Sequence, residues 1–240
     1  MSKEFENIDI KLQQVELLIH KGKIDEANQI LEFFEKNEDI MIDHQLKCSL
    51  FKSKIKAGNL EEGLKHANNT LERNQELGNN HLIAESLYTI GRIYSIRGIK
   101  DSALDYFEKS LDFFKKFGNE KEIGWSFWNI GAIYCHKGKF DTALDHFKIS
   151  KDHFKKFGNK EGHGQALYCM SAMNHDKGEL DLALKYQLQT LRLFKELGNK
   201  PEIAKSLTKI GFIYLSKGDL DRAFENQQQS IALYDEIDKS

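Results

Sequence analysis

Cysteine is scarce in this chain of 240 residues, and the spacing of its three copies excludes two classes of small domain. Cys48, Cys135 and Cys169 are odd in number and include no CxxC pair. The sequence therefore predicts neither a disulfide framework nor a zinc cassette. This cysteine usage fits a reducing compartment best.

The chain also lacks a charge excess and a long apolar run. Its 35 basic and 37 acidic residues nearly cancel, so we expect no bulk attraction to nucleic acid or to an anionic membrane. No apolar run approaches the roughly 18 residues of a membrane span, and the N-terminus lacks the charged-then-apolar pattern of a signal peptide. We expect a soluble, cytoplasmic protein without nucleic-acid or membrane partners.

What the chain does have is a repeat of 40 residues. Glycine recurs in two registers, and asparagine follows each glycine of the second register. The two registers are Gly98, Gly138, Gly178 and Gly218, and Gly78, Gly118, Gly158 and Gly198. Periods of this length are typical of stacked arrays, in which each unit buries its apolar face only against its neighbours. The sequence therefore predicts one elongated domain that binds other molecules rather than transforming them.

Each repeat predicts two amphipathic helices. Between residues 81 and 97, Leu87, Ile90 and Tyr94 recur at helical spacing, and a second apolar stripe follows between residues 99 and 117. The glycine after each stripe accepts the left-handed conformation that a helix C-terminus commonly needs. The fold class is therefore all-α.

Several single residues are expected to fix the ends and contacts of these helices. Gly91 is small where another helix must come close, and Pro201 falls in a first helical turn, where a missing N–H costs nothing. Asp141 and its equivalents are expected to cap the second helix of each repeat and to complement its dipole. Gly162 and Gly164 follow no strand, so they form no phosphate loop, and we interpret them as flexible positions in a helix.

These repeat positions resemble the tetratricopeptide repeat. That family has a small residue and then an aromatic one in the first helix, a turn glycine, and then alanine and a bulky apolar residue in the second. The matches are Gly91, Tyr94, Gly98, Ala103 and Phe107; Gly131, Tyr134, Gly138, Ala143 and Phe147; and Gly211, Tyr214, Gly218 and Ala223. Another copy is looser, with Ser171 and Asn174 in place of glycine and the aromatic residue.

The resemblance implies a right-handed α-solenoid of stacked antiparallel helix pairs. We expect repeats at about residues 38–77, 78–117, 118–157, 158–197 and 198–240, preceded by a divergent repeat or cap at residues 1–37. The long period and the Gly-Asn junctions look like the subgroup that includes Pins/LGN-type adaptors, kinesin light chains and the sensor arrays of MalT-like regulators. The resemblance to the Pins type implies a scaffold or adaptor for protein binding, not an enzyme.

In that architecture the first helix of each pair lines a concave groove, so the free face of each first helix supplies the candidate peptide-binding residues. These are Tyr88, Arg92, Trp125, Trp128, Asn129, His136, Tyr168, His175, Lys205, Lys209 and Phe212. Aromatic side chains are enriched at the energetic centres of interfaces, so Trp125 and Trp128 are the expected anchors. The alternative is that both tryptophans only fill gaps between adjacent repeats.

Basic groups outnumber acidic ones along this face, so a protein or peptide partner with acidic and bulky apolar residues would be complementary. A second hypothesis is a sensory array that binds a small ligand or a signalling peptide and acts on a separate effector. We expect no cofactor, metal or catalytic residue. One metal arrangement stays open, in which Cys135, His136, Cys169 and His175 approach one another across neighbouring first helices.

The last expected helix combines a polar run with an apolar strip. Residues 225–229 are far more polar than the matching run one repeat earlier, as expected of a terminal repeat, so we expect the array to end within this chain. Ile231, Tyr234 and Ile237 form the strip, which predicts end-to-end homodimerisation through the C-terminal helix.

Overall fold

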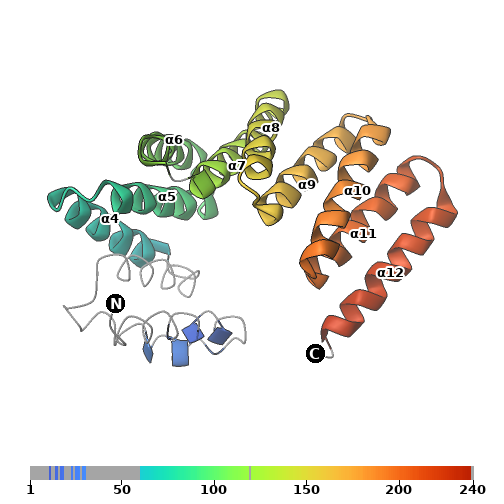
Figure 1. The fold of residues 1–240 in the computed structure, drawn as a ribbon, viewed down its shortest axis with the longest axis horizontal. Coiled ribbons are helices and arrows are strands. Elements are labelled where there is room, and N and C mark those ends of the chain that lie inside the picture. The colour runs from blue at the N-terminus through green and yellow to red at the C-terminus, as the bar shows by residue number, and fades with distance from the viewer. Residues whose placement is uncertain are drawn as a thin grey trace. The chain divides into compact units, whose positions relative to one another are not determined.

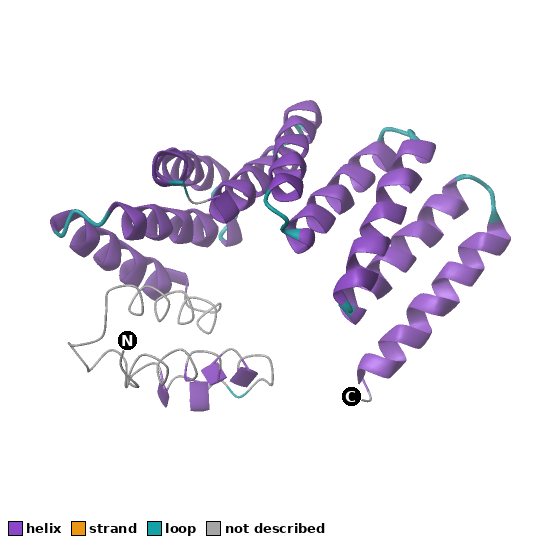
Figure 2. Cartoon of the chain, in the orientation of Figure 1, coloured by secondary structure: helices purple, strands orange, loops and turns teal. Residues whose placement is uncertain are grey.

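The computed structural model describes residues 11, 14–15, 17–18, 23, 25–27, 29–30, 60–118 and 120–238. All regular structure within these residues is helical, with no strand (Figure 2). The chain divides into two compact units, residues 1–118 and 119–240. The repeat or cap expected at residues 1–37, and the first helix expected in residues 38–77, lie largely outside the described residues.

The first unit contains three consecutive described helices, labelled as in Figure 1. They are α4 (Leu60–Glu76), α5 (Asn80–Ile96) and α6 (Lys100–Phe117). The middle helix, α5, packs against both α4 and α6. Ile90 and Ile93 of α5 join Ala67 of α4 in a buried cluster, and Phe107 of α6 is fully buried. The two helices expected from the apolar stripes between residues 81 and 117 are thus α5 and α6.

The second unit is a run of six described helices (Figure 1). They are α7 (Glu120–His136), α8 (Phe140–Lys156), α9 (Lys160–Asp176), α10 (Leu180–Leu197), α11 (Lys200–Ser216) and α12 (Leu220–Asp238). Each helix packs against the next in the chain, and α7 also approaches α9. The fold class is the predicted one, an all-α solenoid in which α7, α9 and α11 are first helices and α8, α10 and α12 are second helices.

Glycine and asparagine together form the junctions between the helices. Gly78, Gly98, Gly118, Gly138, Gly158, Gly178, Gly198 and Gly218 all have positive φ, from 65° to 80°, as expected for helix C-termini. Beyond three of these glycines an asparagine caps the next helix: Asn79, Asn159 and Asn199 each accept a hydrogen bond from the backbone N–H three residues on. Pro201 lies in the first turn of α11, as predicted.

Glycines inside the helices allow phenylalanine rings to lie against the backbone. A Cβ atom on Gly91 would lie 3.0 Å from the Phe107 ring, which confirms the expected close approach. The expected flexibility of Gly162 and Gly164 is wrong. A Cβ atom on Gly162 would lie 2.6 Å from the Phe154 ring, and one on Gly164 would lie 2.9 Å from the Phe194 ring. Both glycines are therefore packing positions.

The acidic residues expected to cap the second helices do not cap α6, α8 or α10, whose N-cap residues make no side-chain cap hydrogen bond. Lys139 is the N-cap residue of α8 and makes no side-chain cap hydrogen bond, whereas Asp141 lies in the first turn and forms an ion pair with Lys177 at the end of α9. Asp181 and Lys217 repeat this pair one period later. Asp141 and Asp181 keep their favourable places at the positive end of a helix dipole, but they also tie each second helix to the following repeat.

Candidate functional site

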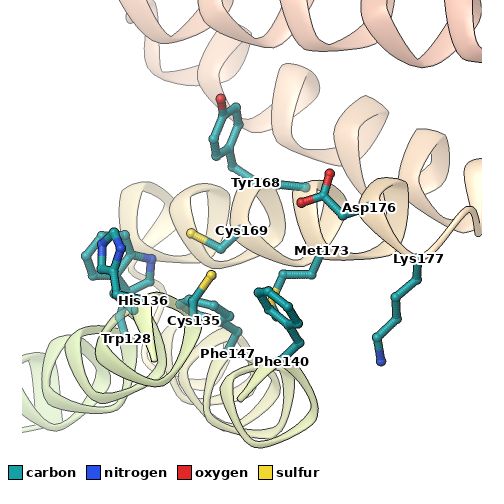
Figure 3. A pocket seen from close by; sticks show the side chains of 12 residues that line it. Trp128, Cys135, His136, Phe140, Phe147, Tyr168, Cys169, Met173, Asp176 and Lys177 are labelled. Atoms are coloured by element: carbon teal, nitrogen blue, oxygen red, sulfur yellow. The ribbon is translucent and has the colours of Figure 1, made fainter. Parts of the chain in front are cut away.

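A pocket of about 330 Å³ opens between the first helices α7 and α9, with residues of α8 at its base (Figure 3). We call it the α7–α9 pocket. It is lined by Trp128, Ala132, Cys135 and His136 of α7, by Phe140 and Phe147 of α8, and by Tyr168, Cys169, Ala172, Met173, Asp176 and Lys177 around the end of α9. Most of these side chains are apolar, so the pocket suits an apolar group.

Helix packing fixes the base and walls of the pocket. Phe147 and Met173 belong to a buried cluster, against which Trp128, Cys135 and Cys169 pack. Gly131 lets the Phe147 ring lie against α7, because a Cβ atom there would come within 3.1 Å of the ring. The pocket is therefore built from tightly packed side chains on adjacent helices, which preorganises it for binding.

The two tryptophans have different surroundings. Their ring centroids are 6.0 Å apart in an edge-to-face arrangement. Trp125 packs on Phe154 of α8, with ring centroids 4.9 Å apart, and does not line the pocket. Trp128 packs on Phe147, with centroids 6.2 Å apart, and forms one wall of the pocket. Trp125 thus fills the gap between α7 and α8, whereas the Trp128 ring is open to the pocket.

Three further candidates on α7 and α9 occupy distinct places. His136 is exposed and Tyr168 is half-buried, and both line the pocket. Asn129 donates a hydrogen bond to the Trp125 carbonyl oxygen at 2.8 Å, within its own helix. The structure therefore brings Trp128, His136 and Tyr168 together around one pocket, whereas Asn129 is not among its lining residues.

His175 is bonded across the repeat. Its Nε2 atom lies 2.9 Å from the Ser216 hydroxyl of α11, and its Nδ1 atom lies 3.3 Å from an Asp176 carboxylate oxygen. His175 joins α9 to α11 and is not among the residues that line the pocket. In this structure, the His175 side chain connects α9 to α11, the next first helix.

The three candidates on α11 do not form part of the pocket. Lys205 is exposed and pairs with Glu202 at 2.6 Å, an interaction that raises the pKa of the lysine. Lys209 is half-buried, and Phe212 is 50% exposed. Phe212 is thus an apolar contact available on α11, separate from the α7–α9 pocket.

Tyr88 and Arg92 belong to the first unit. The Tyr88 ring packs on α6, with centroids 5.5 Å from Phe107 and 6.1 Å from Phe114. It is half-buried, and its packing on Phe107 matches that of Trp128 on Phe147 one period later. Arg92 is half-buried on the same helix.

Two thiols face the pocket from opposite walls (Figure 3). Burial raises the pKa of the Cys169 thiol to about 12, and the neighbouring Trp128 indole N–H opposes this shift without reaching hydrogen-bond geometry. Burial also raises the pKa of Cys135. Both thiols therefore stay protonated near neutral pH and contribute apolar surface, not a nucleophile.

The open metal arrangement is only partly assembled. Cys135, His136 and Cys169 line the pocket, but His175 bonds elsewhere. Among the described residues, no group of three or more His, Cys, Asp or Glu side chains is placed to hold a metal ion. The pocket lining thus offers shape and apolar contact rather than a ligand set.

Sequence reasoning missed five of the residues that make the pocket: Phe140, Phe147, Ala172, Met173 and Lys177. Phe147 was assigned to the repeat pattern alone, and Phe140 begins α8, a second helix. No sequence signal singles out Phe140, because an apolar residue also begins α4, α10 and α12.

The fold defines an all-α protein of stacked helical repeats. The sequence profile of the tetratricopeptide repeat family matches residues 53–116 and 163–236. The chain belongs to the tetratricopeptide repeat family. No curated protein sequence matches it significantly.

Solved structures share the fold at low sequence identity. BtubC (BKLC) from P. vanneervenii superposes with a TM-score of 0.73 at 14% identity, covering 100% of this chain and 94% of that one. A Rap protein complexed with Competence and Sporulation Factor gives 0.65 at 16% identity, covering 96% and 78%. The apo quorum sensor NprR from B. thuringiensis gives 0.68 at 18% identity, covering 93% and 64%. The resemblance to Pins/LGN-type adaptors stays a prediction.

No helix in the described part of the chain combines the length and apolar character needed to cross a membrane.

Proposed function

We propose that this protein is a non-enzymatic scaffold that holds a segment of a partner protein on its first-helix face, with one bulky apolar side chain of the partner in the α7–α9 pocket. The observation that carries this proposal is that Trp128, His136 and Tyr168, three residues expected to bind, surround a single apolar pocket. Membership of a family of binding repeats supports it, as does the related fold of a Rap protein that is complexed with another factor.

The chemistry of the pocket indicates what it accepts. Phe147 and Met173 close its base, so an inserted side chain gains the burial of apolar surface, about 25 cal/mol per Å² removed from water. His136 and Asp176 are exposed at the edge, where they can bond the polar backbone on either side of that side chain. A leucine, methionine or phenylalanine in an otherwise polar segment fits this arrangement.

A pocket-filling substitution tests the proposal. Ala172→Phe places a ring in the pocket, and Ala232→Phe makes the same change at an exposed position of α12. Each variant and the wild type would be used to capture proteins from native extract, after circular dichroism has shown that both are folded. Proteins retained by wild type and Ala232→Phe but lost by Ala172→Phe are the expected result. Equal retention by all three would show that the pocket is not the binding site.

The pocket volume also favours a second candidate function, a sensor of a small ligand. About 330 Å³ is at the lower end of the range for small-molecule pockets, roughly 300–1,000 Å³. A ligand that binds only the folded state raises the apparent melting temperature. A thermal-shift screen of metabolites would show such a rise with wild type and its loss in Ala172→Phe.

The exposed strip on α12 supports the proposal of end-to-end pairing. Ile231 and Tyr234 are 59% and 39% exposed, while Ile237 is half-buried. Sedimentation of the wild type and of Ile231→Lys tests this pairing. We expect the wild type to sediment as a dimer and the lysine variant as a monomer.

A further inference from the structure

A second hollow in the same unit lies between the second helices α8 and α10. It is an open cleft of about 600 Å³, and its more buried lining residues, His163 and Leu167, come from α9. We call it the α8–α10 cleft. Its lining is polar and basic, in contrast to that of the α7–α9 pocket.

Basic side chains outnumber acidic ones in this cleft. Lys151 and Lys155 line it from α8, and Lys185 and Arg192 line it from α10. Lys155 and Lys185 form no ion pair with any residue in the described part of the chain. Among the described residues, the cleft therefore has one lysine without an ion pair on α8 and another on α10.

The two acidic residues of the cleft are already engaged. Asp152 lies 3.0 Å from Lys151, and Glu196 lies 3.2 Å from Arg192 and 2.8 Å from Lys160. These pairs leave the excess positive charge of the cleft in place. The positive charge of the cleft also acts on His163. Its pKa is lowered first by burial and then by the charges of Lys151 and Lys155.

The 40-residue repeat allows the same position to be compared between copies. Residues 83, 123 and 203 are isoleucine and all three are buried, whereas residue 163 is histidine. Residues 111, 191 and 231 are leucine or isoleucine, whereas residue 151 is lysine. At two adjoining positions, this repeat junction has therefore replaced an apolar side chain with a basic one.

At the next repeat junction, the two matching positions hold apolar residues that pack into a core cluster. Leu191 packs there against the cluster of Phe194, Ile203 and Leu207. Leu191 and Ile203 stand one period after Lys151 and His163. At the junction of α10 and α11, Leu191 and Ile203 therefore belong to an apolar cluster, whereas the matching residues of the α8–α10 cleft are basic.

Two further positions of the cleft have reversed charge. Residue 185 is lysine, as is residue 65, but residues 105, 145 and 225 are aspartate or glutamate. Residue 192 is arginine, but residues 112 and 152 are aspartate and residue 232 is alanine. Only this junction has a basic residue at all four positions, which lie on three helices that converge on one cleft. Fold maintenance does not require this change, because the other copies fold without it.

We propose that the α8–α10 cleft binds an acidic segment of a partner protein, with side-chain carboxylates paired to Lys155, Lys185 and Arg192. Leu167 and Leu193 supply an apolar surface beside the cations, so a leucine among the acidic residues adds contact area. The overall net charge of −2 provides no bulk attraction for a polyanion as long as a nucleic acid, so a short acidic segment fits the cleft better. This site is independent of the α7–α9 pocket.

The test uses defined peptides. A fluorescent 12-residue peptide of Glu-Glu-Leu triplets would be titrated against the whole protein by anisotropy, beside its Gln-Gln-Leu analogue, a phosphoserine version and a 12-nucleotide RNA. We expect binding of the glutamate peptide, loss with the glutamine peptide, and weakening as salt rises, because screening weakens the charge pairs. Preference for phosphoserine would identify phosphorylated segments as the source of the anion. Stronger binding of the RNA, or equal binding of the glutamine peptide, would overturn the proposal.

Two variants locate the site. Lys185→Glu should weaken binding about tenfold, since it turns an attraction into a repulsion, whereas Lys121→Glu, the same change on an exposed residue of α7, should leave it unchanged. Equal weakening by both would overturn the assignment. The double change Lys151→Leu, His163→Ile introduces the residues of the next junction and should also weaken binding, because it removes two basic residues from the lining of the cleft. Ala172→Phe should bind the peptide as wild type does, so failure of the pocket proposal and failure of this one are distinguishable.

Discussion

The ring of Phe154 lies directly against the backbone of Gly162, so that a Cβ atom on Gly162 would be 2.6 Å from the ring. The contact joins α8 to the first helix of the next repeat. Gly124 of α7 approaches the same ring from the preceding helix, where a Cβ atom would be 2.5 Å away. Phe154 is fully buried between them, so it has no space into which to move.

Gly162→Ala is therefore expected to destabilise the protein. Alanine in a helix normally stabilises by about 0.5–1 kcal/mol relative to glycine. Overpacking a rigid contact costs about 1–3 kcal/mol, and it exceeds that gain here because the clashing atoms belong to a buried ring. Chemical denaturation would measure the net loss. In a Phe154→Leu background the same change should cost less, and an equal cost in both backgrounds would show that the ring is not responsible.

Removing an asparagine cap is expected to weaken one helix start. The Asn159 side chain accepts a hydrogen bond from the Gly162 N–H at 2.8 Å. Asn159→Ala should cost about 1 kcal/mol of unfolding free energy, the usual effect of losing an N-cap, whereas Asn159→Asp should retain most of the stability. Equal losses in the two variants would indicate that the cap bond contributes little.

Gln187 is expected to be replaceable with a gain in stability. Its side chain is fully buried and both amide atoms lack a hydrogen-bond partner among the described residues. Gln187→Leu should raise the unfolding free energy by about 1–2 kcal/mol, because the desolvation cost of the amide is removed. Gln227, one period later, donates to the Thr208 carbonyl oxygen at 3.2 Å. Gln227→Leu breaks this bond and should not stabilise, which makes it the matched control.

Alkylation of the Cys169 thiol is expected to be slower in the folded protein than in the unfolded one. With a pKa of about 12, only about one Cys169 side chain in ten thousand is a thiolate at pH 8. Iodoacetamide should therefore label Cys169 far more slowly in the native protein than in urea, as measured by peptide mass spectrometry. Native labelling as fast as in urea would show that the α9 wall of the pocket is not packed as described.

Stability is expected to fall as pH falls below about 6.5, the usual pKa of histidine. Burial lowers the pKa of His146, and burial with Lys151 and Lys155 lowers that of His163. The unfolded chain therefore takes up protons at a higher pH than the folded one, so acid favours unfolding. Melting temperatures from pH 8 to pH 5 would measure this, and His163→Ile should reduce the slope. A slope unchanged by this substitution would show that His163 does not contribute.

The sequence predicts the helices well because their signals are local. The spacing of apolar residues and glycines within a few positions predicts α5 and α6 and the left-handed Gly98 and Gly118. It also predicts that Pro201 lies in a first helical turn. The role of Gly162 does not, because its ring partner lies on another helix. The ion pair of Asp141 with Lys177 likewise joins residues 36 positions apart.

The candidate site could be predicted in part. Helical periodicity places Trp128, His136 and Tyr168 on one face, and the structure brings them to one pocket. Helical periodicity does not show that Trp125 packs on Phe154, because the direction of a ring depends on the space that the neighbouring helix leaves. The basic α8–α10 cleft appears only when its residues, scattered over 46 sequence positions from Lys151 to Glu196, are seen together.

Because a Gly-Asn pair stands at both ends of a repeat, removal or duplication of a whole repeat leaves the same junction chemistry. The module from Gly158 to Leu197 begins with a Gly-Asn pair and is followed by another, Gly198 and Asn199. If gene rearrangement removed the module, Phe157 would again be followed by a left-handed glycine and a capping asparagine. Duplication would likewise leave both joins chemically intact. Such an array can gain or lose binding surfaces in whole steps of 40 residues, and deletion of this module would take α9, and with it a wall of both the pocket and the cleft.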